Sequence, residues 1–207
     1  MRRIALLVLV LSALLATGCG QYGKRYDGGE KAKTTGDDAK VSTEPFDAEV
    51  QKRDGCTDVQ EFESEGHTHV DTGTSVKYEH NPPMSGDHWN DPSAHAPADW
   101  GLYDETLKDE QIVHNLEHGH IVISFKGLST KEKDEVYDDA RINDYHLLVY
   151  PRDKNPKKGV YYTAWTKQIY CKHPSKAALQ EMIDNYRDAG PELFTDDASG
   201  GMTTKKK

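Results

Sequence analysis

Two pairs of histidines stand at spacings that suit the binding of one metal ion. His67 and His69 are separated by one residue, so in an extended chain their rings point to the same side, about 6.6–6.8 Å apart along the strand. His114 and His118 are four residues apart, and on a helix such rings lie one above the other and can hold one ion. The two pairs predict a metal site built on imidazole.

Four other residues near these pairs are candidates for parts of the site. His88, in a proline-rich loop, is the fifth candidate ligand of a zinc or copper ion, both of which imidazole suits. Glu117, next to His118, is expected to accept a hydrogen bond from a ligand's imidazole N–H. Met84 and His120 are left out of the ligand set, because a loop methionine usually packs and His120 begins a new strand. The other four histidines are expected at the surface: His80, His95, His146 and His173.

The phase of the predicted helix places its histidines away from its apolar face. At about 100° per residue, with Ile112 at zero, Val113 and Leu116 fall near 100° and 40°. His114 and His118 fall near 200° and 240°. The pair is therefore expected to face solvent, a cleft or another polar layer.

A metallohydrolase is an alternative to a binding domain. The sequence His114-Asn-Leu-Glu117-His118 matches the inverzincin pattern, in which both histidines bind zinc and the glutamate activates a metal-bound water. Those peptidases carry the motif on a long helix of a larger domain, whereas Gly119 is placed to end this helix. Glu117 is thus a catalytic candidate only on the hydrolase reading, and we favour binding without catalysis.

The third alternative is a non-catalytic envelope protein with an interaction or structural role. Its histidines would hold a loop by hydrogen bonds, and Trp89, Trp100 and Tyr103 would form a platform for a glycan or a partner protein. The same aromatics could instead close a small hydrophobic cluster under the loop. The chain has no nucleophile elbow, phosphate-binding glycine loop, dinucleotide fingerprint or CxxC pair, so nucleotide-dependent and thiol-redox functions are not expected.

The N-terminus has the features of a bacterial lipoprotein signal peptide. Two arginines precede an apolar run over residues 4–16, and Ala-Thr-Gly leads to Cys19. The run is too short to span a bilayer. Residues 1–18 are expected to be removed and Cys19 to be lipidated, which anchors the protein to the cell-envelope membrane; ordinary signal cleavage is the alternative. Gly20 replaces the aspartate that signals inner-membrane retention, so a Gram-negative source implies the outer membrane.

Export changes the interpretation of the other two cysteines. The envelope is oxidising, so Cys56 and Cys171 are expected to form a disulfide, with two thiolate metal ligands as the alternative. The bridge would close a loop of 115 residues. In the chain-entropy model, closing such a loop stabilises the fold by about 4–5 kcal/mol. Both cysteines must then belong to one folded unit.

Composition divides the rest of the chain. Residues 19–53 are polar and are predicted to form a flexible tether, residues 54–195 a globular domain, and residues 196–207 a disordered tail. The net charge is −9, and it becomes −11 once residues 1–18, with two arginines and no acid, are removed. Such an acidic domain is a poor partner for nucleic acid.

Periodicity predicts an α+β fold of one domain, with a mixed or antiparallel sheet and two to three helices packed on it. A capping box, Ser129 to Glu132, opens one helix that ends near Ile142. The other helices are expected over residues 109–118 and 175–189. Strands are expected over residues 59–62, 75–78, 120–125, 146–150 and 160–165, with a turn over residues 151–159 and a long loop over residues 81–101.

Four segments together resemble an uncharacterised bacterial family of secreted or membrane-attached proteins, classed as a domain of unknown function. They are Gly-His-Thr-His-Val (66–70), Asn-Pro-Pro-Met-Ser-Gly-Asp-His-Trp (81–89), Trp-Gly-Leu-Tyr (100–103) and His-Asn-Leu-Glu-His-Gly (114–119). The resemblance covers residues 56–170 and implies no activity. It departs from the family pattern at Met84 and His120, where threonine and glycine are usual. The residues that it singles out are His67, His69, His88, His114, Glu117 and His118.

Overall fold

The computed structural model describes residues 39–192, 194–196 and 202–204. The predicted signal peptide (residues 1–18), the lipidation site Cys19 and the first part of the predicted tether lie outside these residues. Within the described ranges, no helix combines the length and the apolar character that crossing a bilayer requires.

The domain is built on a mixed sheet of six strands in the order β1-β8-β7-β5-β6-β4. β6 is parallel to both of its neighbours, and the remaining pairs are antiparallel. The strands are β1 (Gln60–Glu61), β4 (Gly101–Leu102), β5 (Ile121–Lys126), β6 (Leu147–Pro151), β7 (Gly159–Ala164) and β8 (Lys167–Cys171). The predicted α+β class is confirmed, and the sheet is of the mixed type.

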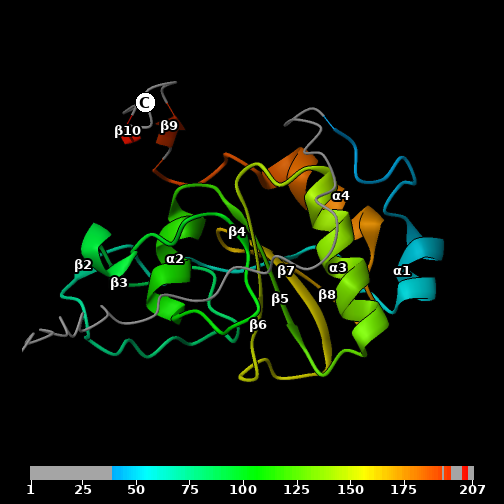
Figure 1. Ribbon diagram of the computed structural model, residues 1–207, viewed down its shortest axis with the longest axis horizontal. Helices are drawn as coiled ribbons and strands as arrows, with labels where there is room; N and C mark the ends of the chain where they lie inside the picture. Colours follow the sequence, from blue (N-terminus) through cyan, green and yellow to red (C-terminus); the bar gives the residue numbers. More distant parts are fainter. Residues whose placement is uncertain (1–38, 193, 197–201, 205–207) are drawn as a thin grey trace, which may run out of the picture.

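Helices cover both faces of this sheet (Figure 1). The longer helices are α2 (Asp109–Glu117), α3 (Thr130–Ile142) and α4 (Lys176–Tyr186). Side chains of α3 and α4 share one buried cluster with the sheet, whereas α2 packs in a second cluster on the opposite face. β5 alternates accordingly: Ile123 belongs to the first cluster and Val122 to the second. The sheet therefore separates α2 from α3 and α4.

Side chains at the helix ends explain where the helices begin. The Ser129 hydroxyl accepts from the backbone N–H of Glu132, whose carboxylate accepts from the N–H of Ser129. The Ser175 hydroxyl accepts from the N–H of Ala178 at the start of α4. Gly119, just after α2, has a φ of 81°, which favours glycine. The predicted helix positions are confirmed.

Two parts of the predicted sheet differ from the structure. Residues 75–78 are not a strand, because the N–H of Val76 donates to the Glu110 carboxylate and not to a neighbouring strand. β8 was not predicted, because the hairpin that joins it to β7 lacks the usual turn residues. Its turn contains Thr166 with a φ of 59°, where glycine or asparagine would have marked a hairpin in the sequence. Moreover, β6 and β7 are not adjacent, since β5 lies between them.

The folded unit begins before the predicted boundary at residue 54. Val41 is buried in the core, and its N–H donates to Gln180 of α4. Helix α1 (Ala48–Asp54) follows, with Asp47 as its N-cap. Residues 39–53 therefore pack on the domain, because the buried side chains of Val41 and Val50 and specific polar contacts compensate for their polar composition.

The disulfide between Cys56 and Cys171 is confirmed, and it joins the segment after α1 to the end of β8. At the other end of the chain, β9 (Phe194–Asp196) pairs antiparallel with β10 (Met202–Thr204). Four residues of the predicted tail, 196 and 202–204, are thus strand residues. The remaining residues of the tail lie outside the described ranges.

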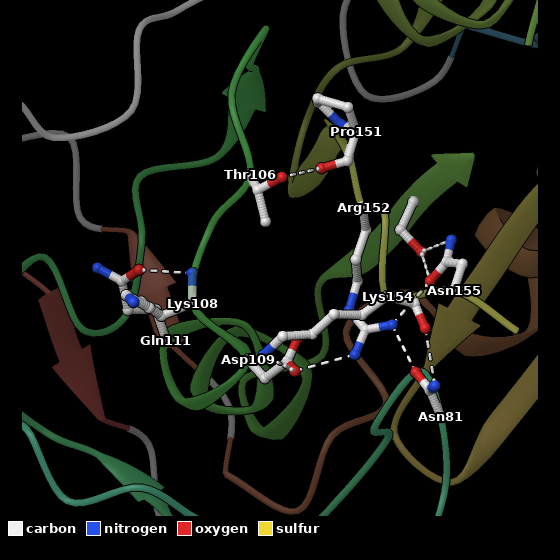
Figure 2. A network of polar contacts seen from close by, with 10 residues as sticks. Asn81, Thr106, Lys108, Asp109, Gln111, Pro151, Arg152, Lys154 and Asn155 are labelled. Atoms are coloured by element: carbon white, nitrogen blue, oxygen red, sulfur yellow. Dashed lines mark hydrogen bonds and ion pairs between the residues drawn. The ribbon is translucent and has the colours of Figure 1, made fainter. Parts of the chain in front are cut away.

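A buried arginine fixes the start of α2 (Figure 2). Arg152 is 2 % exposed, and it donates to both carboxylate oxygens of Asp109 at 2.8 and 2.9 Å. It also donates to the side-chain oxygens of Asn81 and Asn155. A bidentate charge-assisted pair of this kind is directional. It orients α2 relative to β6 and to the loop that begins at Asn81.

A second, smaller ladder lies on the outer side of α2 (Figure 1). β2 (His69–Val70) pairs in parallel with β3 (His88–Trp89), in the register His69 opposite His88 and Val70 opposite Trp89. The long loop over residues 81–101 therefore contains a strand as well as the 3-10 turn Pro92–Ala94. This ladder brings the first histidine pair to the helix that carries the second.

Candidate metal centre

The parallel ladder places two predicted ligands side by side. His69 and His88 are directly opposite each other in the register, so their side chains project from the same face. Their ring centroids are 4.9 Å apart. The face on which they lie is turned toward α2, since the His69 and His114 ring centroids are 5.2 Å apart and those of His88 and His114 4.8 Å apart.

Helix α2 and its C-cap residue His118 contribute three side chains on one face. His114, Glu117 and His118 follow at spacings of three and four, which align on a helix. They turn away from the apolar side chains of the helix, as the phase predicted. All three are at most 2 % exposed, so they face a buried polar layer and not solvent.

Glu117 lies at the centre of the histidines. Its Oε2 is 2.9 Å from Nε2 of His88 and 3.6 Å from Nε2 of His69. Its Oε1 is 3.2 Å from Nδ1 of His67. The sequence assigned this glutamate a supporting role, whereas the geometry places its carboxylate among the donor atoms themselves.

Four side chains could share one metal ion. Candidate donor atoms of His69, His88, His114 and Glu117 all lie within 4.8 Å of one another. His67 contacts the same carboxylate from outside this group, and His118 belongs to an adjoining one. The structure thus brings all five predicted histidines to one place.

Backbone carbonyls fix the tautomers of the buried rings. Nδ1 of His88 is 2.9 Å from the carbonyl of Gly86, and Nδ1 of His114 is 2.7 Å from that of Trp89. A carbonyl can only accept, so each Nδ1 carries the proton and each Nε2 keeps a lone pair in the neutral ring. Metal-binding histidines are commonly oriented by this type of contact.

The contact between His88 and Glu117 lacks a hydrogen bond. Nε2 of His88 and Oε2 of Glu117 are buried and 2.9 Å apart, yet neither forms a hydrogen bond of acceptable geometry with any residue in the described ranges. With Nδ1 of His88 donating to Gly86, a neutral ring would face the carboxylate oxygen with a lone pair. Two acceptors at this distance require a cation between or beside them, either a proton or a metal ion.

Burial keeps the helical histidines neutral. Burial, together with the neighbouring His118 and His88, lowers the pKa of His114 to about 3. Burial also lowers the pKa of His118 to about 4, although the Glu192 carbonyl opposes this shift. Burial raises the pKa of Glu117, but contacts with His88 outweigh it and hold the pKa below its usual range. At neutral pH the helix therefore offers two neutral imidazoles and a carboxylate.

One side of the cluster is open to solvent. The side chain of His67 is 66 % exposed and that of His69 is 41 % exposed, whereas His88 is fully buried. Asn90 lies 3.1 Å from Nδ1 of His69 and orients this exposed ring. An ion could therefore enter past His67 and His69 without unfolding of α2.

The remaining histidines lie outside this group, and the predicted surface exposure of one of them is wrong. His146 was expected at the surface and is 1 % exposed, because the sheet buries its ring against His120 at a centroid distance of 4.5 Å. Its Nδ1 contacts Asp188 at 2.6 Å. His95 and His173 are exposed as expected, and His80 is half-buried.

Met84, Tyr103 and Trp100 pack against other side chains of the domain and do not join the candidate metal centre. Met84 is buried, with its sulfur 3.6 Å from Nε2 of Gln168. Tyr103 is fully buried in the second cluster, against which Trp100 packs. Tyr103 and Trp100 thus belong to the small hydrophobic cluster that the sequence offered as the alternative to a platform.

Sequence reasoning missed Glu192. Its candidate donor atom lies within 4.8 Å of those of Glu117 and His118. The backbone carbonyl of Glu192 accepts from Nδ1 of His118 at 2.8 Å. No sequence signal pointed to this residue, because it follows α4 and reaches α2 only through the tertiary fold.

Comparison with known proteins identifies a family and no activity. The model of the family described as "Protein of unknown function (DUF3105)" matches residues 69–198. No curated protein and no solved structure matches the chain. The chain belongs to the DUF3105 family.

Proposed function

We propose that this member of the DUF3105 family is an envelope lipoprotein that binds a zinc or copper ion through His69, His88, His114 and Glu117. The contact between His88 and Glu117 carries the proposal. Both side chains are buried, their facing atoms are 2.9 Å apart, and the other ring nitrogen of His88 is held by Gly86. A metal ion accepts both lone pairs at once.

The donor set selects the class of metal. Three imidazoles and one carboxylate suit borderline divalent ions such as Zn²⁺ and Cu²⁺, whereas Ca²⁺ and Mg²⁺ prefer oxygen donors alone. The neutral state of His114 supports this choice, because a ligand that is already deprotonated needs no proton release on binding. Four protein donors at a tetrahedral ion would leave little room for a reacting water.

Glu117 also separates binding from hydrolysis. In a hydrolase of the HxxEH type the glutamate activates water beside the metal, and His114 and His118 share the ion. Here Glu117 lies among the donors, and His118 falls in a different donor group from His114. The arrangement favours a binding domain in which Glu117 holds the ion.

The location of the protein is a further part of the proposal. The apolar run before Cys19 supports lipidation at that residue, with the domain facing away from the cytoplasm. Globomycin treatment should accumulate a precursor, and C19A should fail to incorporate a labelled fatty acid. Processing that continues unchanged under globomycin would refute lipidation.

Metal analysis tests the proposed function. The chain should be purified without a histidine tag and its zinc and copper counted by mass spectrometry. We expect at least one ion per chain, lost in H114Q and retained in H95Q, which changes an exposed histidine outside the cluster. A wild-type chain that binds no ion after incubation with Zn²⁺ or Cu²⁺ would refute metal binding and leave an interaction or structural role.

A further inference from the structure

Glu117 belongs to a second group of potential ligands. Donor atoms of Glu117, His118 and Glu192 lie within 4.8 Å of one another, as do those of Glu117 and the three histidines of the first group. The two groups share only this carboxylate. The His114 and His118 rings, one from each group, have centroids 4.7 Å apart.

The backbone holds Glu192 in place. The N–H of Glu192 donates to the carbonyl of Glu117 at 3.1 Å, and the N–H of Asp188 donates to the carbonyl of Gly119 at 2.8 Å. Nδ1 of His118 donates to the carbonyl of Glu192, so Nε2 keeps the lone pair of a neutral ring. These contacts bind the segment after α4 to the end of α2.

Two glycines allow this close approach. A Cβ atom on Gly190 would lie 2.1 Å from the carbonyl oxygen of Glu117, which no real contact tolerates. A Cβ atom on Gly119 would lie 2.7 Å from the Cα of Asp188. Both positions lack a side chain where the two segments meet, and a larger residue at either would push Glu192 away from His118.

We propose that the centre is dinuclear, with Glu117 bridging a first ion and a second Zn²⁺ that is held by His118 and Glu192. This inference rests on the proposed function. The two oxygens of Glu117 already face different partners, Oε2 toward His69 and His88 and Oε1 toward His67. A carboxylate can bridge two ions about 3.5–4 Å apart.

The second ion would differ from the first in its ligands. It has one imidazole and two carboxylates from the described residues, against three imidazoles and one carboxylate for the first ion. Fewer protein donors imply weaker binding and open coordination positions for water or an added ligand. The second site should therefore fill last and empty first during dialysis against a weak chelator.

Stoichiometry tests the dinuclear centre. The full chain, purified in detergent without a histidine tag, is stripped of metal and titrated with Zn²⁺ in a calorimeter. We expect two ions per chain, the second bound about tenfold or more weakly. E192Q and H118Q should bind one ion with unchanged affinity, whereas E105Q, which changes an exposed glutamate outside the centre, should bind two.

Copper provides a second measurement that does not depend on affinity. One equivalent of Cu²⁺ should give the electron paramagnetic resonance spectrum of an isolated ion. A second equivalent should broaden or abolish this signal in the wild type but not in E192Q. A wild-type chain that binds one ion, with no effect of E192Q, refutes the second site and leaves the first. A chain that binds no ion refutes the proposed function as well.

Discussion

His69 and His88 lie opposite each other in the parallel ladder of β2 and β3, and both rings face helix α2. A shift of one residue in this register would turn one ring to the opposite face. Two short strands therefore position two ligands of the proposed metal centre. The ladder is held to the helix by the Nδ1 of His114, which donates to the carbonyl of Trp89.

The two exposed histidines should differ in their importance for the first ion. H69A removes a donor and should weaken Zn²⁺ binding by roughly 100-fold or more, since loss of an outer contact alone costs about 10–100-fold. H67A should weaken binding by less than about tenfold, because His67 lies outside the four-donor group. Both side chains are partly exposed, so folding is spared, and competition with a chromogenic chelator measures the affinities. Equal losses would overturn this ligand assignment.

Glu117 should be required for binding and not only for any catalysis. E117Q keeps the shape of the side chain but removes its charge, so the first ion should be lost from the purified protein. The hydrolase reading makes the opposite prediction: E117Q retains zinc, and the wild type hydrolyses a peptide or ester that E117Q does not. Metal content and a broad hydrolysis assay on the same preparations decide between them.

Metal should stabilise the folded protein. An ion that binds only the folded state adds about 2.7 kcal/mol at a free concentration of 100 times Kd. For a domain of this size, that raises Tm by roughly 5–10 °C. Thermal unfolding followed by circular dichroism should show this shift with Zn²⁺ and its loss with a chelator. H88Q serves as the control, and a shift of the same size in that variant would mean that the ion binds elsewhere.

Asp139 should make stability depend on pH. Burial raises the pKa of Asp139 to about 6, although the nearby Lys176 ammonium opposes this shift. The folded-state pKa lies above the unfolded one, so the unfolded chain binds fewer protons between pH 4 and 6, and stability falls as pH rises through this window. Between pH 4 and 6, the free energy of unfolding of the wild type should fall by on the order of 2 kcal/mol relative to that of D139N.

Urea unfolding at pH 4.5, 6 and 7.5 checks this dependence on Asp139. As the pH rises to about 6–7, the free energy of unfolding of the wild type should fall relative to that of D139N. Above that pH the difference between the two should remain constant. D153N is the matched control, because Asp153 is exposed and lies outside α3. Parallel stability curves for wild type and D139N would show that burial of Asp139 carries no such penalty.

The disulfide should contribute much of the stability of the domain. The replacement C56S/C171S removes the bridge that closes 115 residues, and in the chain-entropy model this costs about 4–5 kcal/mol. The midpoint of urea unfolding should fall accordingly. A double variant as stable as the oxidised wild type would mean that contacts around α1 and β8 alone hold the two ends together.

The sequence predicted the members of the site better than their arrangement. His114 and His118 could be placed on one face of a helix, because their spacing is local. The register of His69 and His88 could not be predicted, since it depends on a ladder of two residues per strand with no hydrophobic alternation. Glu192 left no signal at all, because its position depends on how the chain after α4 packs against α2.

The same distinction applies to the fold. The capping box at Ser129 and the helical spacing of the apolar residues over 175–189 marked these helices correctly, because both signals are local in sequence. Strand order was harder: β5 separates β6 from β7, and nothing in the intervening loop distinguishes this connection from a hairpin. His146 was misplaced for a related reason, since burial against Trp100 and His120 is set by contacts distant in sequence.

X-ray absorption at the metal edge of the untagged chain, loaded with one equivalent of zinc or copper, tests the central claim most directly. A centre of His69, His88, His114 and Glu117 predicts nitrogen and oxygen neighbours at about 2.0–2.2 Å, with the multiple-scattering pattern of about three imidazoles. H88Q should lower the imidazole contribution by about one ring. A spectrum without imidazole scattering, or one that H88Q and H114Q leave unchanged, would contradict the account.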